Sequence, residues 1–212
     1  MTNFIPIFPL GITVFPGEKL NLHIFEPRYK QLILECATLK KPFGIPTVVN
    51  GKISDIGTLV EIAEITTTYE NGEMDIKTKG LAVFHVLEII KEIPDKLFNG
   101  AIVTYPKNDV WAIPELIKKI IVDVAILHKL LEVKKEIKAE GRKLLSYDFA
   151  HHIGMSIDEE FEFMQLFQED QRLEFMRRHL KKVIPMLKDM EKLKAKIQLN
   201  GHFRNLEGFN FS

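Results

Sequence analysis

Apolar and polar residues alternate with a period of two in short segments of the first half of the chain. Leu20–Ile24 and Met74–Thr78 show this alternation, which predicts strands with one buried face. Asn71-Gly72 precedes the second segment and favours the positive φ angles of a tight hairpin turn. Further strands are predicted over residues 5–8, 43–48, 59–69, 81–90 and 101–105. About six or seven strands suffice for a small barrel or sandwich.

One helix interrupts these strands. Pro27 fits a first helical position, where the missing N–H is no loss, and Lys40-Lys41-Pro42 ends the run. The helical period predicts one apolar face, consisting of Tyr29, Leu32, Ile33 and Cys36.

After Tyr105-Pro106 the apolar period changes to 3.6, which indicates helices. Pro114 can begin a long helix that is interrupted near Gly141. Its predicted apolar stripe is Ile117, Ile120, Ile121, Val124, Leu127 and Leu131. This periodicity is all that the segment between Tyr105 and Asp148 displays, so we expect it to support the fold rather than a site.

Three further helices follow. A short helix is predicted over residues 147–153 with its end at Gly154, and Ser156-Ile-Asp-Glu159 is a capping box that begins the next one. The last helix is predicted from about Asp170 to Leu199, with a kink or a fresh start near Pro185 and a stop at Asn200-Gly201. Its apolar residues form a heptad seam, consisting of Leu173, Met176, Leu180, Val183, Leu187 and Met190.

These patterns predict an α+β protein with two parts. Residues 1–106 form a β-rich subdomain, residues 107–113 a junction, and residues 114–212 a helical subdomain with a long C-terminal helix and an aromatic tail. Trp111, the single tryptophan, lies in the junction. We expect it to fill the junction core, with a role as a binding anchor as the alternative.

Composition restricts the class of protein. The 212 residues contain 29 basic and 29 acidic side chains, so the formal net charge is zero and no global field attracts nucleic acid or anionic lipid. The chain has one cysteine, no signal-peptide pattern and no apolar run near the ~20 residues that span a bilayer. We therefore expect a soluble, cytoplasmic protein that needs no membrane.

Motifs for catalysis or cofactor binding are absent from the sequence. Neither G-x-x-x-x-G-K-[ST] nor G-x-G-x-x-G nor G-x-S-x-G occurs. His151-His152 with Asp148 could suggest a metal site, but adjacent helical residues point about 100° apart, so surface or cap roles are favoured. Cys36 is expected to be a small buried hydrophobe. We expect no enzyme activity, no cofactor and no metal.

Several segments resemble the Lon protease N-terminal domain family. The resemblance is carried by Phe8–Gly17, Leu20–Tyr29 with its Phe-Glu-Pro-Arg-Tyr motif, Ile56–Ile62, Lys79–Phe84, Asp148–Ala150 and Gln171–Met176. It implies a PUA-like β pseudo-barrel followed by a helical bundle. In that family the unit recognises protein substrates for degradation. The chain lacks Walker motifs and a Ser-Lys peptidase dyad, so we expect a stand-alone form without the ATPase and peptidase domains.

The resemblance implies a non-catalytic protein-binding module for exposed apolar or unfolded segments of other proteins. We expect protein or peptide clients and, in addition, a separate protease or ATPase as a possible partner. A cleft between the two subdomains is the expected site, since ligands usually bind in such clefts. The candidate residues there are Phe25, Glu26, Arg28, Tyr29 and Trp111. For Glu26 and Arg28, helix-start charges or an ion pair are the favoured alternative to ligand contact.

Two other functions stay open. The PUA-like topology suggests RNA binding, although the zero net charge and the lack of a basic strand face argue against it. An enzyme with an unrecognised site would need titratable groups that converge in one pocket.

Overall fold

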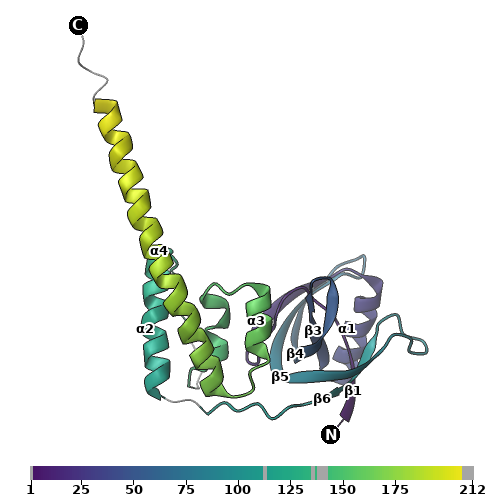
Figure 1. The fold of residues 1–212 in the computed structure, drawn as a ribbon. Helices are drawn as coiled ribbons and strands as arrows, with labels where there is room; N and C mark the ends of the chain where they lie inside the picture. The colour runs from purple at the N-terminus through teal and green to yellow at the C-terminus, as the bar shows by residue number, and fades with distance from the viewer. Residues whose placement is uncertain (1, 112–113, 135–136, 138–142, 207–212) are drawn as a thin grey trace.

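A curved antiparallel sheet with one helix occupies the first half of the chain, and the second half is helical (Figure 1). This computed structural model describes residues 2–111, 114–134, 137 and 143–206. The strands described there are β1 (Thr2–Pro6), β2 (Lys19–Ile24), β3 (Phe43–Val49), β4 (Lys52–Thr68), β5 (Met74–Ile90) and β6 (Gly100–Thr104). The helices are α1 (Pro27–Leu39), α2 (Pro114–Leu130), α3 (Ile157–Met164) and α4 (Glu169–Leu206), with two 3-10 turns, η1 (Ser146–Asp148) and η2 (Ala150–His152). The α+β prediction is confirmed.

The sheet closes on itself in a barrel-like manner. Its strand order is β1-β6-β5-β4-β3, with β2 paired to β5, and all of these pairs are antiparallel. The chain that continues from β1 then pairs with β3 through the parallel bridges Ile7↔Gly44 and Leu10↔Thr47. These bridges join the two ends of the strand order, so most strand edges are covered.

The strands predicted at 74–78 and 81–90 are one strand, β5. Between Leu59↔Ala82 and Val60↔Gly80 the pairing with β4 shifts register, which is a β-bulge. Gly80 is required here because a Cβ at this position would lie 2.2 Å from the main-chain oxygen of Phe15. The bulge breaks the alternation in the sequence without breaking the strand.

Two of the Asn-Gly dipeptides connect neighbouring strands, and they make different turns. At Asn71-Gly72 only the glycine has a positive φ, of 75°, and Tyr69 N donates to Glu73 O, so the hairpin loop has three residues and is looser than predicted. Asn50-Gly51 between β3 and β4 has positive φ at both residues, 51° and 75°, and Val49 pairs with Lys52. The tight hairpin therefore lies at Asn50-Gly51, where no turn was predicted from the sequence.

The first half has its own core beneath α1. The four residues predicted for the buried face of α1 are all buried, and the helix begins at Pro27 as expected. They join a cluster with residues of the sheet and of the loop after β1, among them Phe8, Phe43, Val60 and Ile76. Helix α1 thus covers one opening of the curved sheet.

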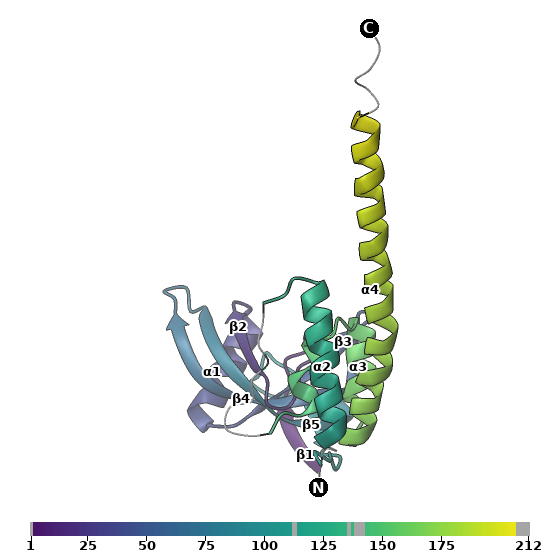
Figure 2. The same cartoon turned by 90° about the vertical axis from the view of Figure 1, so that its left-hand side faces the viewer.

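A second core joins the sheet to the helices. Phe15, which precedes β2, packs against the rings of Tyr147 and Phe163 at centroid distances of 5.7 and 5.6 Å. Ile56 of β4 and Val83 of β5 belong to the same cluster. Helix α3 lies between the sheet and α4, while α2 packs against α4 (Figures 1 and 2). The two halves share a hydrophobic core, which holds the helical part in a defined position.

The helical predictions need four corrections. Helix α2 ends at Leu130, eleven positions before Gly141, which lies outside the described residues. Residues 146–152 form two 3-10 turns instead of a single helix, although Gly154 does take a positive φ, of 73°, after them. Helix α4 has no fresh start at Pro185.

The fourth correction concerns the C-terminal end of α4, which continues through Asn200-Gly201 to Leu206. Of the aromatic tail, residues 207–212 lie outside the described part. The Ser156–Glu159 capping box is confirmed, with both of its reciprocal hydrogen bonds present. In the described part of the chain, no helix has the length and apolarity needed to cross a membrane.

Candidate functional site

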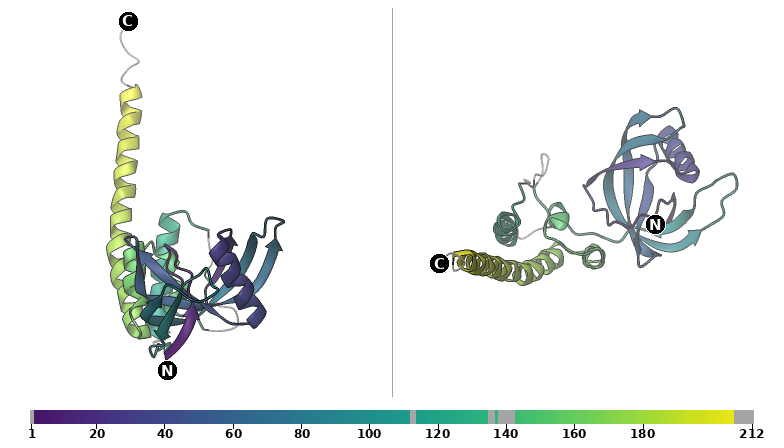
Figure 3. Two further views of the ribbon diagram at one scale, coloured as in Figure 1. Left: turned by 90° about the vertical axis from the view of Figure 1, so that its right-hand side faces the viewer. Right: turned by 90° about the horizontal axis from the view of Figure 1, so that it is seen from above.

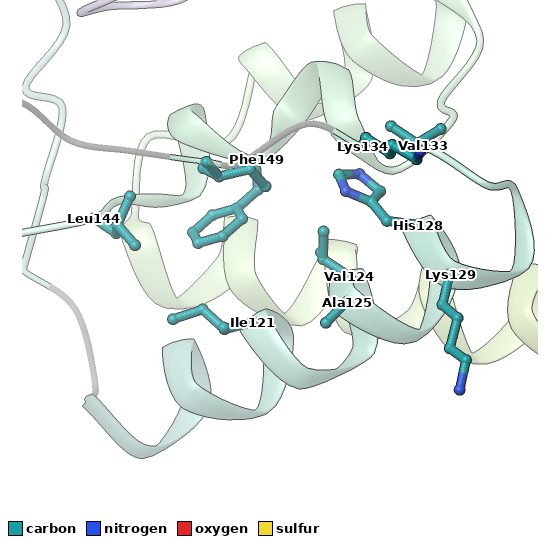
Figure 4. Close-up of a pocket in the computed structure, with 10 residues that line it drawn as sticks. Ile121, Val124, Ala125, His128, Lys129, Val133, Lys134, Leu144 and Phe149 are labelled. Atoms are coloured by element: carbon teal, nitrogen blue, oxygen red, sulfur yellow. The ribbon is translucent and has the colours of Figure 1, made fainter.

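Two adjoining hollows lie along one side of α2. The larger has a volume of about 540 Å³ and is lined by Ile121, Val124, Ala125, His128, Lys129, Val133, Lys134, Ile137, Leu144 and Phe149 (Figure 4). The smaller has a volume of about 390 Å³ and is lined by Val110, Trp111, Pro114, Ile117, Lys118, Lys143, Leu144 and Leu145. Leu144 borders both hollows, so we treat them together as the α2 groove.

The groove follows from the unusual width of the apolar stripe on α2. Ile120, Val124 and Leu127 are buried toward the second core. Ile117 and Ile121 follow the neighbouring row of the helix, and Ile121 is 40% exposed. A helix whose apolar stripe is wider than its packing surface leaves one edge uncovered.

The side chains in the larger hollow point toward a common space. Figure 4 shows Ile121, His128 and Phe149 directed into it, whereas Lys129 extends away. The Nε2 atom of His128 lies 3.0 Å from the carbonyl oxygen of His152, which fixes the ring orientation.

Lysines form the charged part of the rim. The described side chains that line the two hollows include four lysines and no carboxylate, thiol or hydroxyl group. Such a lining suits apolar side chains with neutral or acidic neighbours.

The segment that carries Trp111 is anchored by a buried network. Arg172 donates from Nη1 to Asn108 Oδ1 (2.8 Å) and from Nη2 to the carbonyl oxygen of Asp109 (2.6 Å). Asp109 also donates through its main-chain N–H to Phe167 O, at 2.7 Å, and accepts from the Trp111 N–H at 2.9 Å. Trp111 is thereby held at the entrance of the groove although 78% of it is exposed. The expectation that Trp111 fills the junction core is wrong.

The other candidate residues lie at the start of α1, with Phe25 and Glu26 just before it and Arg28 and Tyr29 in its first turn. Phe25 is 58% exposed, while Tyr29 is buried with its ring 4.0 Å from that of Phe8. The Arg28 guanidinium lies 4.5 Å above the Tyr29 ring and pairs with Glu26 at 2.7 Å. The ion pair favoured for Glu26 and Arg28 is thus formed.

The structure does not bring the five candidates into one site. Helices α1 and α2, which follow Phe25 and Trp111 respectively, lie at opposite ends of the molecule in two views (Figures 1 and 3). Phe25 instead neighbours His23, with ring centroids 6.1 Å apart. Sequence reasoning also missed the α2 groove, for which the extra width of the α2 stripe was the available signal.

His151 connects the two halves of the chain. Its Nδ1 lies 2.7 Å from a Glu160 oxygen and its Nε2 3.1 Å from a Glu18 oxygen, so it bridges α3 and the start of β2. Burial lowers the pKa of His151, but the hydrogen bonds with the two carboxylates dominate and raise it to about 10. The doubly paired imidazolium is a structural clamp.

The remaining reactive side chain is Cys36. It is 2% exposed, and its burial, with the nearby Glu35 charge, raises the pKa of the thiol to about 11. A thiol of this kind is chemically inert at neutral pH. Among the described residues, no group of three or more His, Cys, Asp or Glu side chains is placed to hold a metal ion.

Comparison with known proteins gives one family. A family model described as the ATP-dependent protease La (LON) substrate-binding domain matches residues 5–182. The chain is similar to the crystal structure of a Lon N-terminal domain protein from Xanthomonas campestris, with 22% identity and a TM-score of 0.61, over 81% of this chain and 95% of that chain. It is also similar to the N-terminal domain of the Mycobacterium avium complex Lon protease, with 10% identity and a TM-score of 0.62, over 85% of this chain and 100% of that chain. At these identities the structural matches show the fold.

Proposed function

Because the chain belongs to the family of ATP-dependent protease La (LON) substrate-binding domains, we propose that it is a non-catalytic module that binds exposed apolar or unfolded segments of protein clients in the α2 groove. The clients would be proteins destined for degradation or quality control in the cytoplasm. A separate protease or ATPase would act on the bound client.

The mainly apolar lining of the α2 groove supports this proposal. Two hollows of about 540 and 390 Å³ meet at Leu144, and each lies within the size range of ligand sites. Trp111 stands at one end with 78% of its surface exposed, and large aromatic side chains are frequent anchors in protein interfaces. An extended segment could place successive apolar side chains in the two hollows.

Phe25 belongs to the proposal as a second contact on the β-rich part. Its ring is exposed and the next residue in the chain, Glu26, pairs with Arg28, so this segment offers both an apolar side chain and charges. Tyr29 is buried and acts there only by supporting the Arg28 side chain above it. A long unfolded client could contact both surfaces, whereas a short peptide would use the groove alone.

Binding of a reduced, alkylated model protein tests the groove. Ile121→Asp and Trp111→Ala should each weaken binding to the full chain by at least about tenfold, since a charge or a lost aromatic ring removes apolar contact. Neither change should unfold the protein, because both side chains are exposed. Fluorescence anisotropy of the labelled client measures the affinity, and circular dichroism checks the fold.

Val122→Asp is the matched control. Val122 is 59% exposed on the same helix but faces a different hollow, between α2 and α4. This variant should bind the client like the unmodified chain. If all three variants bind the client as tightly as the unmodified chain does, the proposed site is refuted. If all three lose affinity to the same extent, the loss does not come from the groove, and the proposed site is refuted as well. Salt-sensitive retention of RNA in place of the client would favour the alternative function.

A further inference from the structure

The outer half of α4 carries an apolar stripe that no described residue covers. We call Met186, Met190, Leu193 and Ile197 the distal stripe; their exposed fractions are 52, 60, 59 and 63%. Every residue from Lys188 to Leu199 is exposed. Two perpendicular views show this half of the helix extending away from the rest of the molecule (Figures 1 and 3).

The distal stripe does not continue the face that α4 packs against its own chain. That inner face contains Leu173, Met176, Leu180 and Ile184, and it ends at the half-buried Leu187. Further along the helix, the same row consists of Glu191, Lys194 and Gln198. Met190 was assigned to the inner seam from the sequence, and its exposure shows that this assignment is wrong. The apolar residues therefore change to another side of the helix where the chain's own packing ends.

The spacing of the distal stripe is that of a two-stranded coiled coil. Its members follow one another at four, three and four residues, which places Met190 and Ile197 at a positions and Met186 and Leu193 at d positions. A β-branched residue at a with leucine at d favours two parallel strands, and Ile197 and Leu193 fit this rule. The whole stripe lies beyond residue 182, where the family match ends.

We propose that the distal stripe pairs with the same stripe of a second copy of this chain, as a parallel, in-register coiled coil. Charge complementarity supports this occupant. Asp189 flanks the stripe at a g position and Lys194 at the following e position, and these are the positions that face each other across a parallel pair. Each dimer thus gains two opposite-charge contacts.

The charges beside the stripe also bear on an alternative occupant, an anionic lipid surface. Asp189 now pairs with Lys192 at 3.0 Å, with both side chains 74% exposed, and such a surface pair is weak enough to exchange partners. An anionic lipid surface would repel Asp189 but attract Lys194 and Lys196, which also flank the stripe, so vesicle binding is a separate outcome of the test. A second copy neutralises Asp189 with Lys194.

The mass of the full chain in solution tests the proposal. Sedimentation equilibrium at about 100 μM should give twice 24.5 kDa for the unmodified chain and a single 24.5 kDa for Leu193→Asp. Ala195→Asp is the matched control, because it adds the same charge on the opposite side of the same helix. It should remain dimeric. Both positions are exposed, so circular dichroism should be unchanged in either variant.

Disulfide crosslinking tests the register. Leu193→Cys should form a covalent dimer on mild oxidation, since d positions face each other in a parallel pair, whereas Ala195→Cys should not. The native Cys36 is 2% exposed and gives no background. A monomeric unmodified chain, a dimer that survives Leu193→Asp, or equal crosslinking of the two cysteine variants would overturn the proposal. So would a monomer whose vesicle binding is lost in Leu193→Asp.

Discussion

Replacing Arg172 by methionine removes the centre of the buried polar network that holds the junction. The Arg172 side chain is fully buried with Glu169, at 2.7 Å. Its five N–H groups meet acceptors on Ser146, Glu169, Asn108, Leu166 and Asp109. The guanidinium also lies 4.3 Å above the Tyr147 ring. Methionine has a similar length but supplies neither the charge nor any donor.

The expected cost follows from what the substitution leaves behind. Glu169 would keep the hydrogen bonds from the Ser146 N–H and hydroxyl, both 2.7 Å, but would lose its cation. Removing one partner of a buried ion pair costs about 3–5 kcal/mol, because the other charge stays buried and uncompensated. With an m-value of about 2 kcal/mol per molar urea, the unfolding midpoint should fall by about 1.5–2.5 M.

Urea unfolding followed by circular dichroism measures this effect. Tryptophan fluorescence is a poor probe here because Trp111 is already 78% exposed in the folded chain. Arg177→Met is the control on the same helix, since Arg177 pairs with Glu174 at the surface. Its unfolding midpoint should stay close to that of the unmodified chain, because water screens an exposed ion pair.

The double variant Arg172→Met/Glu169→Leu separates the two contributions. It removes the orphaned carboxylate, so it should be more stable than Arg172→Met alone. A loss below about 1 kcal/mol in Arg172→Met would refute the reasoning, since it would mean that the network contributes no more than an exposed pair. No recovery in the double variant would locate the cost in the lost hydrogen bonds to the junction and not in the uncompensated charge.

Two further predictions concern the His151 clamp between the halves and the β-bulge at Gly80. His151→Gln should destabilise the chain most below about pH 6.5, and the difference should disappear as the pH rises toward 10, because the folded-state pKa of His151 is raised to about 10; a difference that grows with pH would contradict the clamp. Gly80→Ala should cost about 1–3 kcal/mol, since its Cβ would lie 2.2 Å from Phe15 O, whereas Gly11→Ala, with no atom within 4 Å, should be neutral in the same thermal unfolding assay; equal stability of the two variants would show that the bulge relaxes without cost.

Local interactions explain what could be predicted from the sequence. Pro27 begins α1, and the Ser156–Glu159 capping box begins α3, because each depends on residues within one helical turn. The buried face of α1 follows from its 3.6-residue period. The α+β organisation follows from the change of period after Pro106, and the family resemblance agrees with the model match over residues 5–182.

Tertiary packing decided which of the apolar residues are buried, because burial depends on which surfaces of the folded chain meet. The period of α2 could not tell that Ile120 would be buried and Ile121 left at a groove, because this depends on how α4 and residues 143–149 approach the helix. Trp111 is exposed because Arg172, 61 positions later, fixes the main chain next to it. Likewise, the apolar residues of α4 change from the inner face to the distal stripe where the packing of the helix against its own chain ends. Hydrophobic periodicity identifies the residues that need a partner, but the three-dimensional arrangement determines which of them find one within the same chain.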